Sequence, residues 1–174
     1  PRGGAALARG EARGGLGGVA LGAAILGEGD IFMRGRAPAA PTVESDLLWR
    51  MDLLETLASR RFRPEDAERY GIHGGHARRV WASRTQLLRV ARGGINKEGG
   101  GGEGGVARAL LAGFPGSVCR RRRRGEPAAR MVGGRGVVLS RGSGVRDADI
   151  FLALEVEGGR RGAFANSPVR MASA

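Results

Sequence analysis

The sequence predicts an α+β chain with helices in its first part, a glycine-rich linker and a small antiparallel β-barrel at its C-terminal end. Three observations carry this prediction. Apolar residues recur at helical spacing as far as residue 92. The run GGINKEGGGGEGG follows at 93–105. Beyond it, short apolar runs alternate with turn signals at a spacing of roughly 8–14 residues. We therefore expect a helical region over 1–92, a linker over 93–105 and a β-rich domain over 106–174.

The helical part is predicted from apolar residues three to four positions apart. The clearest helix covers 43–58, where Leu47, Met51 and Leu54 fall on one face. Thr42 or Ser45 can cap its first turn. The other helical segments are 1–31, which glycines interrupt, 64–71, 75–92 and the short run VARALLAGF at 106–114.

The β-rich part is predicted from short apolar runs that breaks such as GEP and RGSG separate. Breaks of this composition are typical of the turns between neighbouring strands. The runs are SVCRR (117–121), AARMV (128–132), GVVLS (136–140), IFLALEV (150–156) and AFANSPVRM (163–171).

The charge of the chain is strongly positive and uneven. Its 29 basic and 17 acidic residues give a net charge of +12, and Lys97 is the single lysine among the basic residues. Residues 106–174 hold 13 arginines and 5 acidic residues (+8), against +4 for the preceding part. This excess predicts an anionic partner, and arginine suits phosphate because its planar fork binds two oxygens at once. GC-rich coding is an equally good explanation of the preference for arginine over lysine.

Several classes of protein are excluded or disfavoured. A P-loop needs GK followed by Ser or Thr, and Lys97 is followed by Glu98. Cys119 is the single cysteine, so an internal disulfide and a multi-cysteine zinc site are excluded, and a reduced, cytoplasmic setting is expected. The longest apolar run, 19–26, is far shorter than the roughly 20 residues that cross a bilayer, so no membrane partner is expected. Because the chain begins with Pro1 rather than Met, we expect a processed chain or a fragment.

An arginine run is the strongest candidate for a binding site. In a strand, alternate arginines would point to opposite faces, so the later ones are expected in a loop at the strand end. We interpret the run as phosphate contacts to RNA or DNA, and a solvated run without a specific partner is the alternative. The predicted nucleic-acid-binding residues are Arg120, Arg121, Arg122, Arg123, Arg124, Arg130 and Arg135.

Other candidate chemistry is weaker. His73 and His76 have the spacing of helix metal ligands, but glycines lie between them, and a polar loop or a helix cap is favoured. Asp147 and Asp149 precede a strand, where ordinary turn carboxylates are favoured over a Mg²⁺ site. A loose match to a dinucleotide fingerprint at 15–20 follows no strand. We therefore predict no metal, no cofactor and no catalytic residue in this chain.

The aromatic residues are predicted to pack rather than to stack on bases. Trp49 and Trp81 lie on predicted helices, and Phe114, Phe151 and Phe164 lie in apolar runs of the β-rich part. A nucleic-acid contact is therefore expected to depend on arginine and phosphate, which position a strand without reading its sequence.

Several segments, taken in order, resemble one known family. ALLAGFPGSVCRRR (109–122), GGRGVVLS (133–140) and IFLALEVEGG (150–159) resemble the C-terminal region of HrpB-type ATP-dependent helicases of the DEAH/RHA class. Upstream, the chain is similar to the helical ratchet region of that family in GAAILGEGDIFMRG (22–35), VESDLLWRMDLLE (43–55) and HARRVWASRTQLLRVA (76–91). The resemblance covers nearly the whole chain. It is poorest at the linker, and the glycines of RGGLGGVALG (13–22) depart from the family pattern.

The resemblance implies a ratchet-like helical region followed by an OB-like β-barrel, with the helicase motor absent. The Walker A, DExH and QRxGRAGR motifs of the family do not occur in this sequence. ATP and Mg²⁺ are therefore implied only for the missing motor domains, and this chain alone is not expected to hydrolyse ATP.

Two functions follow as expectations. The first is a C-terminal accessory part of an ATP-dependent RNA helicase, which lines the nucleic-acid channel and has single-stranded RNA or DNA and the motor domains as partners. The alternative is a basic scaffold module that docks on the helicase motor or on another acidic protein.

Overall fold

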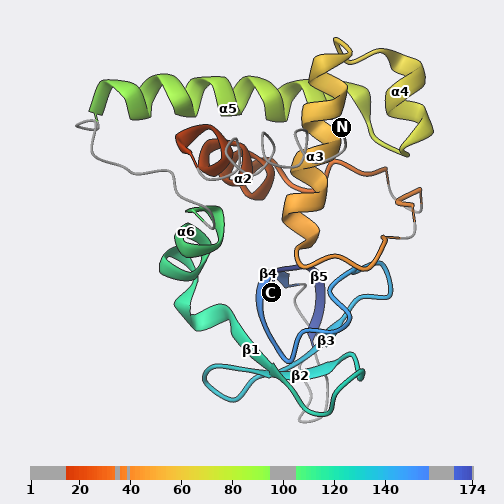
Figure 1. Ribbon diagram of the computed structural model, residues 1–174, viewed down its shortest axis with the longest axis vertical. Helices are drawn as coiled ribbons and strands as arrows, with labels where there is room; N and C mark the ends of the chain where they lie inside the picture. Colours follow the sequence, from red (N-terminus) through yellow and green to blue (C-terminus); the bar gives the residue numbers. More distant parts are fainter. Residues whose placement is uncertain (1–14, 34–35, 39, 95–104, 157–166, 174) are drawn as a thin grey trace, which may run out of the picture. The chain divides into compact units, whose positions relative to one another are not determined.

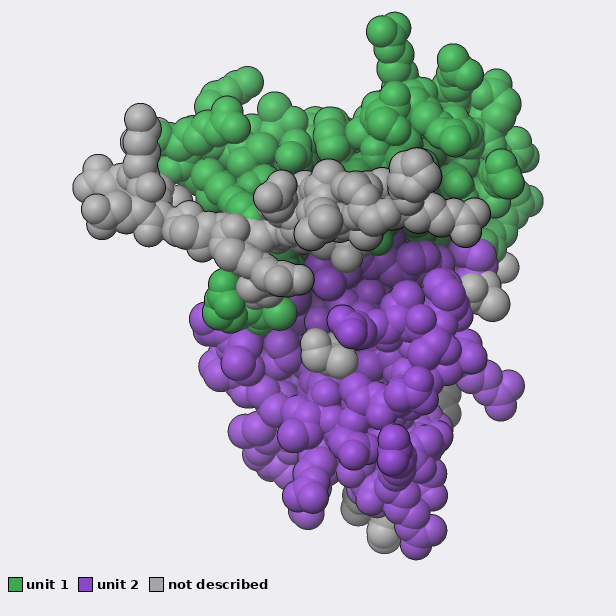
Figure 2. Space-filling view, in the orientation of Figure 1, with its two compact units in different colours: residues 1–36, 51–109 green, residues 37–50, 110–174 purple. Residues whose placement is uncertain are grey.

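The chain divides into two compact units (Figures 1 and 2). The computed structural model describes residues 15–33, 36–38, 40–94, 105–156 and 167–173. Unit 1 comprises 1–36 and 51–109, and unit 2 comprises 37–50 and 110–174. The combination of helices and a β-sheet confirms the α+β class. Within the described ranges, no helix has both the length and the apolar character that a membrane crossing requires.

The helices follow the apolar periodicity of the sequence closely. The expected helices over 43–58, 64–71 and 75–92 are present, as is the short one after the linker. Of the segment 1–31, residues 16–28 form a helix, and 1–14 lie outside the described residues, as does most of the linker. The helices are α2 (Leu16–Glu28), α3 (Asp46–Ser59), α4 (Pro64–Arg69), α5 (Gly74–Gly94) and α6 (Gly105–Gly113), with a 3₁₀ turn η1 (Pro115–Ser117).

Glycine-rich α2 is a helix because it packs against α5 in unit 1 (Figure 1). Leu21 and Ile25 are fully buried, and the buried Gly18 and Gly22 add no side-chain volume between the helices. The Nε of Arg84 on α5 donates to the carbonyl oxygen of Gly17 at 3.3 Å. Tertiary packing thus stabilises a sequence whose intrinsic helix propensity is low.

The strands of unit 2 lie close to the five expected runs and form one closed sheet. Its order is β1-β2-β3-β5-β4, and β4 pairs back onto β1. The strands are β1 (Val118–Arg121), β2 (Ala128–Met131), β3 (Gly136–Leu139), β4 (Ile150–Val156) and β5 (Ser167–Ser173).

One strand pair contradicts the expectation of a fully antiparallel barrel. β3 and β5 are parallel, with Val137 opposite Ser167, whereas the other neighbouring pairs are antiparallel. The reason is the strand number. A closed ring of five strands cannot alternate direction at every step, so at least one neighbouring pair must run the same way.

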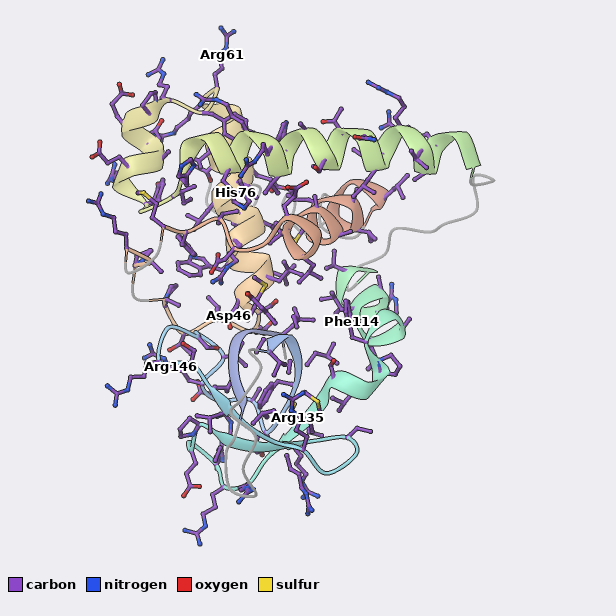
Figure 3. All side chains as sticks on the ribbon, turned by 180° about the vertical axis from the view of Figure 1, so that it is seen from behind. Asp46, Arg61, His76, Phe114, Arg135 and Arg146 are labelled. Atoms are coloured by element: carbon purple, nitrogen blue, oxygen red, sulfur yellow. The ribbon has the colours of Figure 1, made fainter. Side chains whose placement is uncertain are left out.

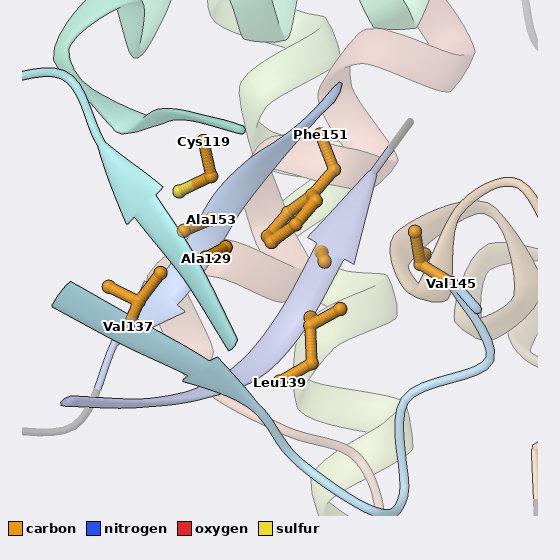
Figure 4. Packing of buried hydrophobic residues seen from close by; sticks show 8 residues of the cluster. Cys119, Ala129, Val137, Leu139, Val145, Phe151 and Ala153 are labelled. Atoms are coloured by element: carbon orange, nitrogen blue, oxygen red, sulfur yellow. The ribbon is translucent and has the colours of Figure 1, made fainter. Parts of the chain in front are cut away.

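The core of unit 2 forms from the inward side chains of the barrel (Figure 4). Burial alternates along β3, where Val137 and Leu139 are buried and their neighbours are half-buried. Phe151 on β4 is 2% exposed, which confirms its expected core position. The buried members of the cluster are Cys119, Ala129, Val137, Leu139, Val145, Phe151, Ala153 and Ala172.

The segment 37–50 belongs to unit 2, although the sequence assigned it to the helical region, because Asp46 joins it to the barrel (Figure 3). The Asp46 side chain is fully buried at the start of α3. Its carboxylate accepts hydrogen bonds from Ser143 Oγ at 2.6 Å, Gly144 N at 2.7 Å and Ala172 N at 3.0 Å. The preceding residue, Ser45, caps α3 by accepting a hydrogen bond from Leu48 N at 3.2 Å.

Gly144 has to be glycine at this junction. A Cβ there would overlap the carbonyl oxygen of Pro41 and lie 2.6 Å from Cγ2 of Val43. The Val43 N–H also donates to the Gly144 carbonyl oxygen at 2.9 Å. The two backbones therefore run in direct contact, which leaves no space for a side chain.

The Cys119 thiol is predicted to be unreactive in the folded chain. Burial in the barrel core raises its pKa from 9.0 to about 11, and a backbone hydrogen bond from Ala153 offsets part of that rise. The pKa of the folded thiol is higher than that of the unfolded thiol. The free energy of unfolding is therefore fully retained below about pH 9 and falls as the pH rises from about 9 through about 11. We expect alkylation at about pH 8 to be slow until denaturant is added. Fast alkylation of the native chain would contradict the buried position.

Candidate nucleic-acid interface

Arg120 and Arg130 form a like-charge pair on the outer face of the barrel. Arg120 on β1 lies opposite Arg130 on β2 in the strand register, and both side chains are exposed. Directly opposed residues in an antiparallel pair have Cβ atoms roughly 4.5–5.5 Å apart, and like charges at that spacing are destabilising. An anion bound between the two guanidinium groups would relieve the repulsion.

These two arginines line an open hollow of about 370 Å³, which we call the arginine hollow. Its lining contains arginine and aliphatic side chains and no acidic residue, so its potential is positive. The lining residues are Val118, Arg120, Arg121, Arg122, Arg130, Met131 and Val132.

The β1–β2 loop extends the basic surface away from the arginine hollow. β1 ends at Arg121, so the later arginines lie in a loop at the strand end, as expected. Arg122, Arg123 and Arg124 are all exposed. A weak surface ion pair links the guanidinium of Arg123 to Glu126, with 3.7 Å between the charged atoms. Such exposed pairs contribute little, so the arginine can exchange this partner for a phosphate.

Arg135 lies on the next turn, between β2 and β3 (Figure 3). Its carbonyl oxygen accepts a hydrogen bond from Met131 N at 2.8 Å, which closes the turn. Gly133 and Gly134 take the positive φ angles that this turn needs. The turn thus places the exposed Arg135 near the Met131 and Val132 edge of the arginine hollow.

Arg121 differs from the other predicted binding residues because its side chain is buried and 7% exposed. Its guanidinium donates to the carbonyl oxygens of Glu126 at 2.5 Å, Ala148 at 2.8 Å and Val145 at 2.9 Å. The same group lies 5.5 Å from the ring centre of Phe151, within cation–π range. Its hydrogen bonds thus hold the β1–β2 loop and the segment 145–148 together. The predicted phosphate contact at Arg121 is therefore wrong, because its buried guanidinium is occupied by carbonyl oxygens and positions the β1–β2 loop.

Replacing Arg121 by lysine is expected to loosen the β1–β2 loop. Lysine keeps the charge but cannot reach three carbonyl oxygens with a planar fork, which should cost about 1–3 kcal/mol. Trypsin should then cleave faster at residues 122–124, as mapped by mass spectrometry. Arg141→Lys, at an exposed loop arginine, is the matched control and should leave the rate unchanged. Equal cleavage of the wild-type chain and Arg121→Lys would contradict the positioning role.

The two histidines are used locally in unit 1. His73 Nδ1 accepts a hydrogen bond from His76 N at 3.1 Å, so His73 caps the first turn of α5, in agreement with the expected helix-cap role. His76 Nδ1 lies 2.9 Å from an Arg79 guanidinium nitrogen. Among the residues that the structure describes, no group of three or more His, Cys, Asp or Glu side chains is arranged to hold a metal ion.

The aromatic predictions have mixed outcomes. Trp81 packs edge-on against Phe62 at 5.9 Å between ring centres, and the Arg84 guanidinium lies 4.6 Å from its ring. Phe164 lies outside the described residues. The core assignment of Phe114 is wrong, because this side chain is 37% exposed (Figure 3). It precedes η1 in a connector, where the backbone offers no inward face of a strand.

The sequence did not reveal the apolar part of the arginine hollow. Val118, Met131 and Val132 lie beside the arginines because β1 and β2 pair with Cys119 opposite Met131. The Gly133–Gly134 turn that follows Val132 indicated a hairpin tip, which is the one signal that this valine is exposed. The register itself cannot be deduced from the two runs.

No family model matches the chain, and no curated protein matches it either.

Proposed function

We propose that unit 2 is a phosphate-directed module for single-stranded nucleic acid. The observation that carries this proposal is the convergence of Arg120, Arg122 and Arg130 on one hollow without an acidic residue. Arg123 and Arg124 on the adjoining loop add to the same surface. One arginine guanidinium donates hydrogen bonds to two oxygens of a phosphate at once. Such contacts neutralise the charge of the nucleic-acid backbone and carry no information about base sequence.

The OB-like assignment is part of this proposal, and the strand order supports it. A five-stranded, partly open Greek-key barrel is the architecture of OB domains, which bind oligonucleotides on the face of strands 2 and 3 and on the loops between strands 1 and 2 and between strands 4 and 5. The order β1-β2-β3-β5-β4 is compatible with that architecture. Arg122, Arg123 and Arg124 of the arginine run lie in the loop between β1 and β2, which corresponds to one of those binding loops.

At the level of the whole protein, we propose a C-terminal accessory part of an HrpB-type DEAH/RHA helicase. The ordered resemblance of the sequence segments supports this proposal, together with the helical unit 1 before the basic barrel. In that role the chain would line the path of the single strand, and motor domains elsewhere would bind ATP.

A binding titration tests the nucleic-acid proposal. Fluorescence anisotropy should show that labelled single-stranded RNA and DNA oligonucleotides of unrelated sequence bind the full chain at about 50 mM salt. Their Kd values should agree within a fewfold because phosphate contacts are independent of sequence. Absence of binding at this salt concentration would contradict the proposal.

The second candidate is a docking module for an acidic protein, such as the helicase motor. The exposure of Val132 (59%) and Ile150 (62%) on the barrel favours it, because exposed aliphatic side chains next to charges are common at protein interfaces. Mixing the chain with separately produced motor domains distinguishes the candidates. A complex that survives high salt, together with negligible oligonucleotide binding, would favour docking.

A further inference from the structure

The floor of the arginine hollow is more apolar than phosphate binding requires. Val118, Met131 and Val132 line it together with the arginines, and Val132 is 59% exposed. A phosphate oxygen gains nothing from an aliphatic surface, because contact with it replaces water without providing a hydrogen bond. The floor therefore suits a ligand group that is flat and weakly polar.

The arginines that line the hollow suit the same kind of group. Arg120 and Arg130 are cross-strand neighbours on β1 and β2, and their guanidinium groups are planar. In nucleic-acid complexes, unstacked bases stack on the guanidinium planes of arginine as well as on aromatic rings. The volume of about 370 Å³ lies at the low end of the roughly 300–1,000 Å³ typical of small-ligand sites. That volume is sufficient for a single base.

We propose that the arginine hollow takes one unstacked nucleobase of the bound strand, with its ring on the Val118, Met131 and Val132 floor and against Arg120 and Arg130. This inference rests on the proposed function and adds a contact to the base itself. The flanking phosphates then reach the N–H edges of the Arg120 and Arg130 guanidinium groups, whose faces contact the base, together with Arg122 and the β1–β2 loop. A duplex is a poor ligand for this site, because its bases remain stacked and paired.

Abasic oligonucleotides test the inference directly. Two single strands of equal length, one normal and one with every base removed, carry the same phosphate charge. The full chain should bind the abasic strand at least about fivefold more weakly, in both DNA and RNA versions, and the salt dependence should be the same. Equal affinity for the two strands overturns the base contact and leaves phosphate binding intact. Absence of binding to either strand overturns the proposed function as well.

Two exposed aliphatic residues provide matched variants. Val132→Ser changes the floor of the hollow, whereas Val90→Ser changes an exposed valine on α5 of unit 1 that does not line it. Because both positions are exposed, neither change should disturb folding. Val132→Ser should weaken binding of the normal strand severalfold and leave the abasic strand unaffected, while Val90→Ser changes neither. An equal effect of Val132→Ser on both strands, or the same effect from Val90→Ser, overturns the inference.

Discussion

Replacing Arg122, Arg123 and Arg124 together by alanine is expected to weaken binding of single-stranded oligonucleotides about 500-fold at about 50 mM salt. Each lost phosphate contact on a single strand removes about 0.7 from the slope of log K against log salt concentration. Three lost contacts lower the slope by about 2.1, and 50 mM lies about 1.3 decades of salt concentration below 1 M, so the affinity should fall by about 2.7 decades. The measurement is an anisotropy titration with two unrelated sequences, and both should lose affinity equally.

The control for this experiment has the same change in net charge. Arg63, Arg69 and Arg89 are exposed arginines of unit 1, outside the proposed interface. Their triple alanine variant should retain most of the affinity. If it loses as much as the loop variant, then binding reflects the overall charge of the chain, and the arginine hollow and the β1–β2 loop are not its site.

Asp46→Ala is expected to give the largest loss of stability, about 3–5 kcal/mol in the free energy of unfolding of unit 2. The change removes a buried carboxylate that accepts three hydrogen bonds and leaves the Ser143 hydroxyl and the Gly144 and Ala172 N–H groups without an acceptor. Each buried donor left unsatisfied costs about 1–3 kcal/mol. Urea denaturation followed by circular dichroism measures the effect.

Two further variants define the cause of that loss. Asp46→Asn preserves the shape but turns one acceptor into a donor, so it should also destabilise the chain. Asp147→Ala removes an exposed carboxylate and should stay within about 0.5 kcal/mol of the wild-type chain. An Asp46→Ala variant as stable as Asp147→Ala would show that the three hydrogen bonds do not hold segment 37–50 to the barrel.

The local elements could be predicted from the sequence because each has a short-range signal. The period of Leu47, Met51 and Leu54 predicts α3, and Ser45 caps it as one of the two expected candidates. Turn residues between apolar runs predict the strands of the barrel. The loop position of Arg122 was likewise predictable, because five consecutive arginines cannot all lie in a strand with one buried face.

The long-range features could not be predicted. Asp46 looked like an ordinary acidic residue in the first turn of a helix, yet its partners lie about a hundred residues further along the chain. Arg121 looked identical to its neighbours, and the carbonyl oxygens that bind its guanidinium come from two separate loops. Strand order and register decide such contacts, and no local pattern encodes either of them.

We propose that the exposed arginines of unit 2 bind the phosphates of a single strand. A salt titration of the wild-type chain measures these contacts. With about 3–5 phosphates neutralised, affinity for a single-stranded oligonucleotide should fall about 20- to 100-fold between about 50 and 200 mM salt. An affinity that stays constant over that range would contradict the claim.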